Sequence, residues 1–299
     1  MARQTVRRHD LSKRRLLVGH TGITWLDPAA EEGIKCIAAL GYNNIEVFAW
    51  VLKAFHDKGR ADICKQYNIP LISSYYSIDI ADPSRKESEI AKLSEWTDII
   101  VAMGGKFATF GGNQVPRRSF NFNENKKYIV EFVNEAAKIL EGKGMKLNFH
   151  PHTGTPVETE EEIRSFMDAV DTRHVGFAPD VGQIQKGGAD PLKITKDYIS
   201  VIKLVHLKDY CGKIKFDAEG REIDQSGFAG YCPLGQGVVD LKSILDALED
   251  YKAFDGPIMV ELDGTSQMPI SAEKAVAINK EYMEKLGYSF VKTGGHDEQ

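Results

Sequence analysis

The sequence has few of the features that mark secreted, membrane or nucleic-acid-binding proteins. Its four cysteines form no CxxC pair and no zinc-finger spacing, which favours reduced thiols in a cytoplasmic protein over a disulfide framework. No apolar run approaches the roughly 18–20 residues that span a bilayer, and residues 1–15 are basic but lack the apolar core of a secretory signal. The net charge of −5 gives no electrostatic reason to expect nucleic acid or an anionic membrane as a partner.

The composition is that of one folded domain. A chain of 299 residues with 42% hydrophobic and 27% charged residues can bury a substantial core. No compositional break or linker divides it, so we expect a single domain over 16–290. A flexible N-terminal arm, 1–15, precedes it, and a disordered tail, 291–299, follows it.

Short apolar runs alternate with segments of helical periodicity along the chain. The expected strands are 16–20, 44–48, 70–74, 106–110, 146–149, 175–179, 201–205 and 257–260. The helices between them include one that Asp27 caps and Pro28 opens, and others at 84–103, 124–140, 158–170, 241–248 and 271–286. Each helix serves as the crossover that parallel strands require. Eight such units predict an α/β protein with a (β/α)8 TIM barrel, whereas the alternative, an open doubly wound sheet, lacks a glycine-rich phosphate loop after its first strand.

Polar side chains end four consecutive strands in the second half of the chain. They are His150 and His152, which share a strand face with Asn148, and then Asp180, His206 and Glu261. The active site of such a barrel lies at these strand ends. Imidazoles and carboxylates suit Zn, Mn, Fe or Co, and four ligands leave positions free for a substrate's oxygen atoms. Each residue alone could instead have a structural role, as Asp180 could cap a helix. Their recurrence at the ends of four consecutive strands favours a metal site.

Other residues near the strand ends are candidates for contact with a substrate. We expect His20, Trp25, Glu46, Gln183 and Asp209 to take this role, with Trp25 and Trp50 forming either an apolar wall or ordinary packing. Lys208 shares a face with His206 and could act as a catalytic acid or base. The alternative for Lys208 is a surface lysine paired with Asp209.

Several motifs resemble the xylose isomerase-like TIM barrel superfamily, and within it the inosose dehydratase (2-keto-myo-inositol dehydratase) branch is the most similar. The resemblance runs over most of 16–287 and rests on His150-Pro-His152-Thr-Gly154, Asp180-Val-Gly182, Gly188-Ala-Asp190-Pro191, Val205-His206-Leu-Lys208-Asp209 and Glu261. It implies one divalent metal ion, most often Mn or Co, with Zn, Mg or Fe as alternatives. The implied ligands are His150, Asp180, His206 and Glu261, although the sequence leaves open whether His150 or His152 is the ligand.

The sequence departs from the superfamily pattern at two positions. Many isomerases and epimerases of the superfamily have glutamate where this chain has His150, so a mechanism with paired glutamates is disfavoured. Many members also have histidine where this chain has Gln183. That substitution and the acidic net charge argue against the multi-zinc endonuclease-IV-like branch.

Together these features predict a lyase or dehydratase that acts on a keto-inositol or keto-sugar. The metal would polarise the ketone, His152 would remove the adjacent proton, and the enediolate would undergo β-elimination. Return of the proton to another carbon or face would instead make the protein an isomerase or 3-epimerase. A keto-glycoside lyase, with a wider mouth shaped by 211–237, and a non-catalytic sugar-binding barrel are further alternatives. By analogy with the superfamily, the barrel could form a homo-oligomer.

Overall fold

The structure is a computed structural model that describes residues 14–25, 27–212, 215–216, 222–223 and 227–290. The expected tail and most of the expected N-terminal arm lie outside these residues. None of the helices in the described part is both long and apolar enough to cross a membrane.

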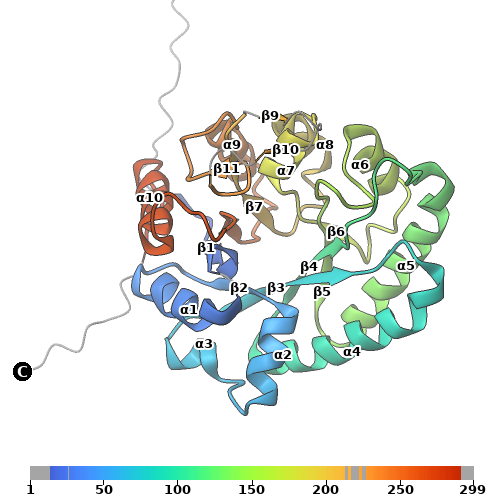
Figure 1. Ribbon diagram of the computed structural model, residues 1–299, viewed down its shortest axis with the longest axis horizontal. Helices are drawn as coiled ribbons and strands as arrows, with labels where there is room; N and C mark the ends of the chain where they lie inside the picture. Colours follow the sequence, from blue (N-terminus) through green and yellow to red (C-terminus); the bar gives the residue numbers. More distant parts are fainter. Residues whose placement is uncertain (1–13, 26, 213–214, 217–221, 224–226, 291–299) are drawn as a thin grey trace, which may run out of the picture.

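Eight parallel strands form the barrel, as the sequence predicts (Figure 1). Their order is β6-β5-β4-β3-β2-β1-β12-β7. Two bridges, Phe177 to Ile202 and Asp180 to His206, join the β6 edge to the β7 edge and close the sheet. The strands are β1 (Val18–Thr21), β2 (Ile45–Phe48), β3 (Leu71–Ile78), β4 (Phe107–Gly112), β5 (Lys146–Phe149), β6 (Gly176–Phe177), β7 (Val205–Leu207) and β12 (Ile258–Val260).

Helices surround the strands on the outside of the barrel (Figure 1). On the longest helix, the residues Ile129, Phe132, Val133, Ala136 and Leu140 recur at helical spacing and are all buried, so this stripe packs on the strands. The helical elements are η1 (Gly22–Thr24), η2 (Asp27–Ala29), α1 (Ala30–Ala39), α2 (Ala49–Asp57), α3 (Ile63–Gln66), η3 (Pro83–Arg85), α4 (Lys86–Met103), α5 (Phe122–Gly142), α6 (Glu160–Met167), α7 (Val181–Lys186), α8 (Pro191–Tyr198), α9 (Leu241–Asp250) and α10 (Ala272–Lys285).

Several local predictions differ from the structure. Asp27 does not cap α1, because it lies in the preceding 3-10 turn and accepts a hydrogen bond from Nε1 of Trp50 at 3.0 Å. After β2 the sequence pattern predicts one helix through Leu52, Phe55 and 61–64, but the segment forms two helices, α2 and α3. Arg14 and Arg15, which we expected in the flexible arm, form ion pairs with α9, Arg14 with Asp246 at 2.6 Å and Arg15 with Glu249 at 3.4 Å.

Two further elements were absent from the prediction. Helix α7 begins directly after Asp180, where we expected no helix before the short one that ends at Tyr198. In the polar segment after β7, β8 (Asp209–Tyr210) pairs antiparallel with β11 (Tyr231–Cys232). The short strands β9 (Lys215–Phe216) and β10 (Glu222–Ile223) also pair there.

A small apolar cluster fills the barrel interior beneath the strand ends. It consists of Ala178, Leu204 and Met259, with Ile72 and Phe107 packed against them. Ile72 and Phe107 lie at or near the first residues of β3 and β4, so this cluster is toward the start of the strands. The polar residues at the strand ends therefore rest on an apolar floor.

His20 connects β1 to α10 in the layer outside the strands. Its Nδ1 lies 2.6 Å from the Thr21 carbonyl oxygen, to which it donates, and its Nε2 lies 3.3 Å from Nδ2 of Asn279. Asn279 also accepts a hydrogen bond from the Leu234 amide at 2.8 Å, and the His20 ring packs edge-on against Tyr42. Complete burial lowers the pKa of His20 from 6.5 to about 4. His20 is therefore neutral at pH 7 and helps to hold β1, α10 and the 234 segment together.

This burial makes stability depend on pH. The folded state takes up the His20 proton only near pH 4, whereas the unfolded chain takes it up near 6.5, so the free energy of unfolding should fall as the pH falls from 6.5 to 4. For this fully buried side chain the shift corresponds to about 3 kcal/mol. We expect that in His20→Gln the free energy of unfolding, measured by urea titration between pH 6.5 and 4, will lack this part of the decline. His56→Gln, at an exposed helical position, is the control, and identical slopes for wild type and His20→Gln would contradict the assignment.

Candidate active site

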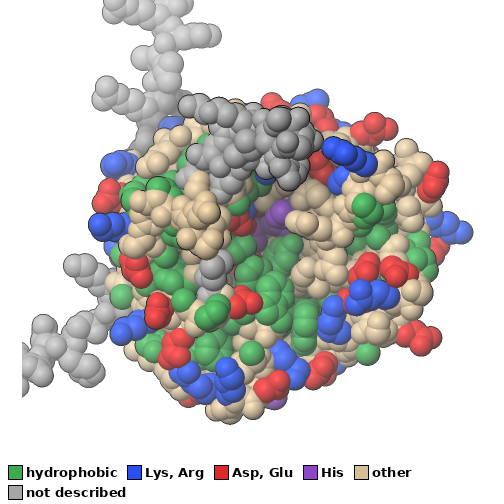
Figure 2. Space-filling model, in the orientation of Figure 1, with side chains coloured by type: hydrophobic (Ala, Val, Ile, Leu, Met, Phe, Trp, Pro, Cys, Tyr) green, Lys and Arg blue, Asp and Glu red, His purple; other side chains and the backbone are tan. Residues whose placement is uncertain are grey.

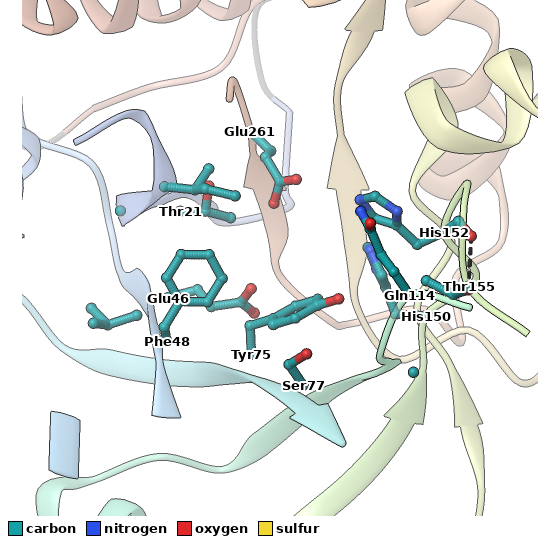
Figure 3. Close-up of a pocket in the computed structure, with 14 residues that line it drawn as sticks. Thr21, Glu46, Phe48, Tyr75, Ser77, Gln114, His150, His152, Thr155 and Glu261 are labelled. Carbon is teal, nitrogen blue, oxygen red and sulfur yellow. Dashed lines mark hydrogen bonds between the residues drawn. The ribbon is translucent and has the colours of Figure 1, made fainter. Parts of the chain in front are cut away.

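A cavity of about 220 Å³ opens at the carboxyl ends of the strands. Figure 2 shows a hollow near the centre of this face, with histidine inside it and hydrophobic side chains beside it. The cavity is smaller than the roughly 300–1,000 Å³ pockets of drug-sized ligands, so it suits a compact molecule. Its lining residues are Thr21, Gly22, Ile23, Glu46, Val47, Phe48, Tyr75, Ser77, Gly112, Gln114, His150, His152, Thr155 and Glu261 (Figure 3).

His150 is buried at the end of β5 with no hydrogen-bond partner for either ring nitrogen among the described residues. Its Nε2 lies 3.9 Å from Oδ2 of Asp180, and its ring packs against those of Tyr75 and His206. Burial lowers the pKa of His150 well below its usual value, so the ring is neutral and has a free lone pair. Leaving a buried polar group unpaired is costly. An unpartnered imidazole in this position fits a metal ligand.

His206, on β7, lies between two carboxylates. Its Nδ1 is 2.8 Å from Oε2 of Glu261 and its Nε2 is 2.9 Å from Oε1 of Glu46. Neither oxygen is in line with a ring N–H, so neither contact has hydrogen-bond geometry. Burial alone would lower the pKa of His206, but the Glu261 and Glu46 carboxylates outweigh it and raise that pKa well above the usual value.

Asp180 has the capping role that the sequence offered as an alternative to metal binding. Its Oδ1 caps α7 by accepting the amides of Gly182 at 2.9 Å and Gln183 at 3.0 Å. Its Oδ2 lies on the side of His150. The cap holds the carboxylate in one orientation, with its second oxygen directed toward His150 and Lys208.

The four predicted ligands come together and are joined by Glu46. Two groups have their ligand atoms within 4.8 Å of one another, His150 with Asp180 and His206, and Glu46 with His206 and Glu261. All five side chains are buried. The donor set therefore fits a divalent metal ion, with His206 common to both groups. His152 lies farther out, with its ring centroid 6.1 Å from that of His150.

Lys208 is fully buried, so its alternative as a surface lysine paired with Asp209 is wrong. Its Nζ lies 2.7 Å from Oε1 of Glu261, 2.7 Å from Oδ2 of Asp263 and 3.5 Å from Oδ2 of Asp180. Burial would lower the pKa of Lys208, but these carboxylates outweigh it and raise the pKa well above its usual value. Lys208 is therefore an ammonium ion that neutralises part of the site, and the ring of Tyr231 covers it at 4.3 Å.

Asp209 points away from the cavity, although we expected it to contact the substrate. Its side chain accepts four backbone amides, from Gly235 and Gly237 at 2.9 Å, Tyr210 at 3.0 Å and Val239 at 3.2 Å. A Cβ atom on Gly237 would lie 2.2 Å from Oδ1 of Asp209. Asp209 thus organises the loop after β11 and does not line the cavity.

A chain of hydrogen bonds fixes the orientation of His152. Its Nδ1 lies 2.7 Å from the Thr153 carbonyl oxygen, to which it donates, and its Nε2 accepts from the Gln183 amide nitrogen at 2.7 Å. The Gln183 oxygen in turn accepts from Oγ1 of Thr153 at 2.6 Å. Burial, together with the charge of Lys208, lowers the pKa of His152. The ring is therefore neutral at pH 7, with its lone pair on Nε2. Gln183, which we expected to contact the substrate, hydrogen-bonds to His152 and does not line the cavity.

Two other expected substrate contacts do not line the cavity. The ring of His20 lies in the outer layer, and Trp25 packs on Gly33 of α1. Sequence reasoning missed the aromatic wall, which consists of Phe48, stacked on Trp50 at 4.2 Å, and Tyr75 (Figure 3). The signal was present, because Phe48 follows Glu46 by two residues and so shares its strand face.

Comparisons with known proteins agree with this architecture. The family model described as "Xylose isomerase-like TIM barrel" matches residues 28–286. The inosose dehydratase of Geobacillus kaustophilus is 30% identical over 238 residues, which are 74% of this chain and 76% of that protein. Among solved structures, the IOLI protein with a zinc atom has a TM-score of 0.72 at 18% identity and covers 93% of this chain and 100% of its own.

A further structure with the same fold is a D-allulose 3-epimerase from Methylomonas sp. in complex with D-allulose. Its TM-score is 0.70 at 18% identity, and the match covers 91% of this chain and 98% of the epimerase. The two structural likenesses show the fold, and the family match extends over most of the sequence. The chain belongs to the xylose isomerase-like TIM barrel family.

Proposed function

We propose that the protein is a divalent-metal-dependent dehydratase that acts on a keto-inositol or a related keto-sugar by β-elimination. Its inosose dehydratase relatives and its family make it a sugar-modifying enzyme of the dehydratase, isomerase or epimerase kind, so the non-catalytic barrel is set aside. The more specific proposal of a metal-dependent dehydratase rests on His150, which is buried without a hydrogen-bond partner beside Asp180 and His206, at the edge of a compact cavity.

His150, Asp180, His206 and Glu261 would hold the metal ion. Such an ion would supply Lewis-acid polarisation of a ketone oxygen, which acidifies the adjacent carbon. The zinc atom in the IOLI structure supports a divalent ion in this fold. Lys208 does not line the cavity, so its proposed part is to hold Glu261 and Asp263 in place, instead of meeting the substrate as the sequence had suggested.

His152 is the proposed base. Its Nε2 carries the lone pair, and to take a substrate proton it would exchange the hydrogen bond from the Gln183 amide for the substrate C–H. His152 removes the proton next to the ketone, a carbon–carbon double bond forms, and the neighbouring C–O bond breaks. The proton held by His152 then leaves with the hydroxide as water, which balances the reaction.

The lining of the cavity suits a polyhydroxylated ring. Phe48 and Tyr75 offer apolar surface for the ring's C–H face, while Gln114 and Thr155 offer polar atoms for hydroxyl groups (Figure 3). Mixed lining of this kind is typical of small-molecule sites. It supports a compact carbohydrate as the substrate.

An isomerase or 3-epimerase is the second candidate. Such an enzyme moves a proton between two carbons or two faces, and two proton-carrying groups serve that purpose best. The cavity contains a carboxylate, Glu46, in addition to His152. Product analysis separates the candidates, because elimination yields a dehydrated product and isomerisation or epimerisation conserves mass.

Metal analysis of wild type and Asp180→Ala tests the metal centre. We expect about one equivalent of divalent transition metal in wild type, dehydration of keto-inositol by the loaded protein, and loss of both in the variant. Asp190→Ala is the matched control, because Asp190 caps α8 as Asp180 caps α7 but lies outside the cluster. No bound metal in wild type after loading with Mn or Co would overturn the proposal.

Replacing His152 with alanine tests the base. We expect turnover to fall by about 10²–10⁴-fold, together with loss of solvent deuterium uptake at the carbon beside the ketone. Metal content should stay at the wild-type level, because His152 is not among the proposed ligands. Unchanged turnover in His152→Ala would remove it from this role, and loss of metal would make it a ligand instead.

A further inference from the structure

Glu46 is the one member of the candidate metal cluster that comes from the first half of the barrel. It lies on β2 with only 2% of its surface exposed, whereas the four ligands implied by the sequence lie on or just after strands β5, β6, β7 and β12. Figure 3 shows the carboxylates of Glu46 and Glu261 both directed into the cavity. A buried carboxylate of this kind requires a compensating charge.

The neighbours of Glu46 fix one of its oxygens and leave the other facing the cluster. Thr109, on β4, donates its hydroxyl to Oε2 at 2.6 Å. Oε1 lies 2.9 Å from Nε2 of His206. In the described part of the chain, His206 is the only basic side chain with an ion-pair contact to Glu46, and no Lys or Arg makes one. Once His206 binds an ion through a ring nitrogen it gives up its own positive charge, and the divalent cation then balances this carboxylate.

The distances are those between ligands that share one ion. Two donor atoms bonded at about 2.1 Å to one ion, at right angles, are about 3.0 Å apart, and opposite donors are about 4.2 Å apart. The contact of Glu46 with His206 is 2.9 Å and is out of line with the ring N–H. The ligand atoms of Glu46, His206 and Glu261 all lie within 4.8 Å of one another. A ring nitrogen of His206 therefore has a carboxylate oxygen of each glutamate within that distance, Glu46 beside Nε2 and Glu261 beside Nδ1.

From these observations we propose that Glu46 is an additional ligand of the metal ion, and that Thr109 is the residue that positions it. The inference rests on the proposed metal-dependent function and adds a ligand outside the set implied by the resemblance. An independent pointer to an ion in this place is His150, fully buried and unpartnered beside His206. The extra carboxylate gives the centre more negative charge and ties the ion to both halves of the barrel.

Affinity for Mn²⁺ tests this directly, without any assay of turnover. Calorimetric titration of the metal-free full chain should show at least about tenfold weaker binding in Glu46→Gln, and about tenfold weaker binding in Thr109→Val, as for other residues that orient ligands. Glu89→Gln is the matched control, because Glu89 is also 2% exposed but pairs with Arg85 and Lys92 away from the cluster. Thr97→Val is the control for Thr109, because Thr97 is equally buried and donates to a helix carbonyl.

Anomalous diffraction from Mn-loaded crystals gives the second readout. An oxygen of Glu46 should lie about 2.2 Å from the ion. An ion beyond bonding distance of Glu46, or unchanged affinity in Glu46→Gln with loss in Asp180→Ala, would overturn the additional ligand and leave the proposed function intact. Absence of any metal in wild type would overturn both. Should Glu46→Gln fail to fold by circular dichroism, the affinity of Thr109→Val decides.

Discussion

The buried ion pair between Lys208 and Glu261 is the interaction on which the candidate site depends. Asp180, Glu261 and Asp263 all lie within 3.5 Å of the Lys208 ammonium, and removing so many carboxylates from water without a partner would cost several kcal/mol for each. Lys208 and the protonated His206 offset part of this cost but not all of it, because Glu46 adds a fourth carboxylate on the other side of His206. The remaining negative charge is what makes a divalent cation suitable here. Lys208 thus keeps Glu261 in place while leaving charge for the ion.

The same residues close the barrel. Strand β6 has only two residues, and the sheet is completed across this seam by the bridges from Phe177 to Ile202 and from Asp180 to His206. Asp180 also caps α7 with the oxygen that does not face His150. An ion bound by Asp180 and His206 would therefore hold the two edges of the sheet together, so metal binding and closure of the barrel support each other. The backbone bridges hold the two edges of the sheet together, and the side-chain ligands would hold them together through the ion.

Much of this arrangement was predictable from the sequence, because a parallel barrel gathers the ends of its strands. Periodicity located the eight strands, and the polar residues that end four of them were the cluster that the structure brings together. Burial and pairing were harder to predict. The partners of Lys208 are 28, 53 and 55 residues away in the chain, so no local pattern distinguishes it from a surface lysine. Asp209 is similar, since its four amide partners lie mostly in a loop about 30 residues later.

The rule that failed for His20 and Asp209 is that a polar residue at a strand end faces the site. Side chains alternate along a strand, and the face matters as much as the position. A Cβ atom on Gly19 would touch Met259 of the interior cluster, so Gly19 and Thr21 face inward and His20 must face the helices. After β7, His206 and Lys208 face inward, which turns Asp209 outward. Once one residue of a strand is known to face the interior, alternation fixes the face of its neighbours. The same alternation that places His150 and His152 on one face after β5 therefore excludes His20 and Asp209 from the cavity.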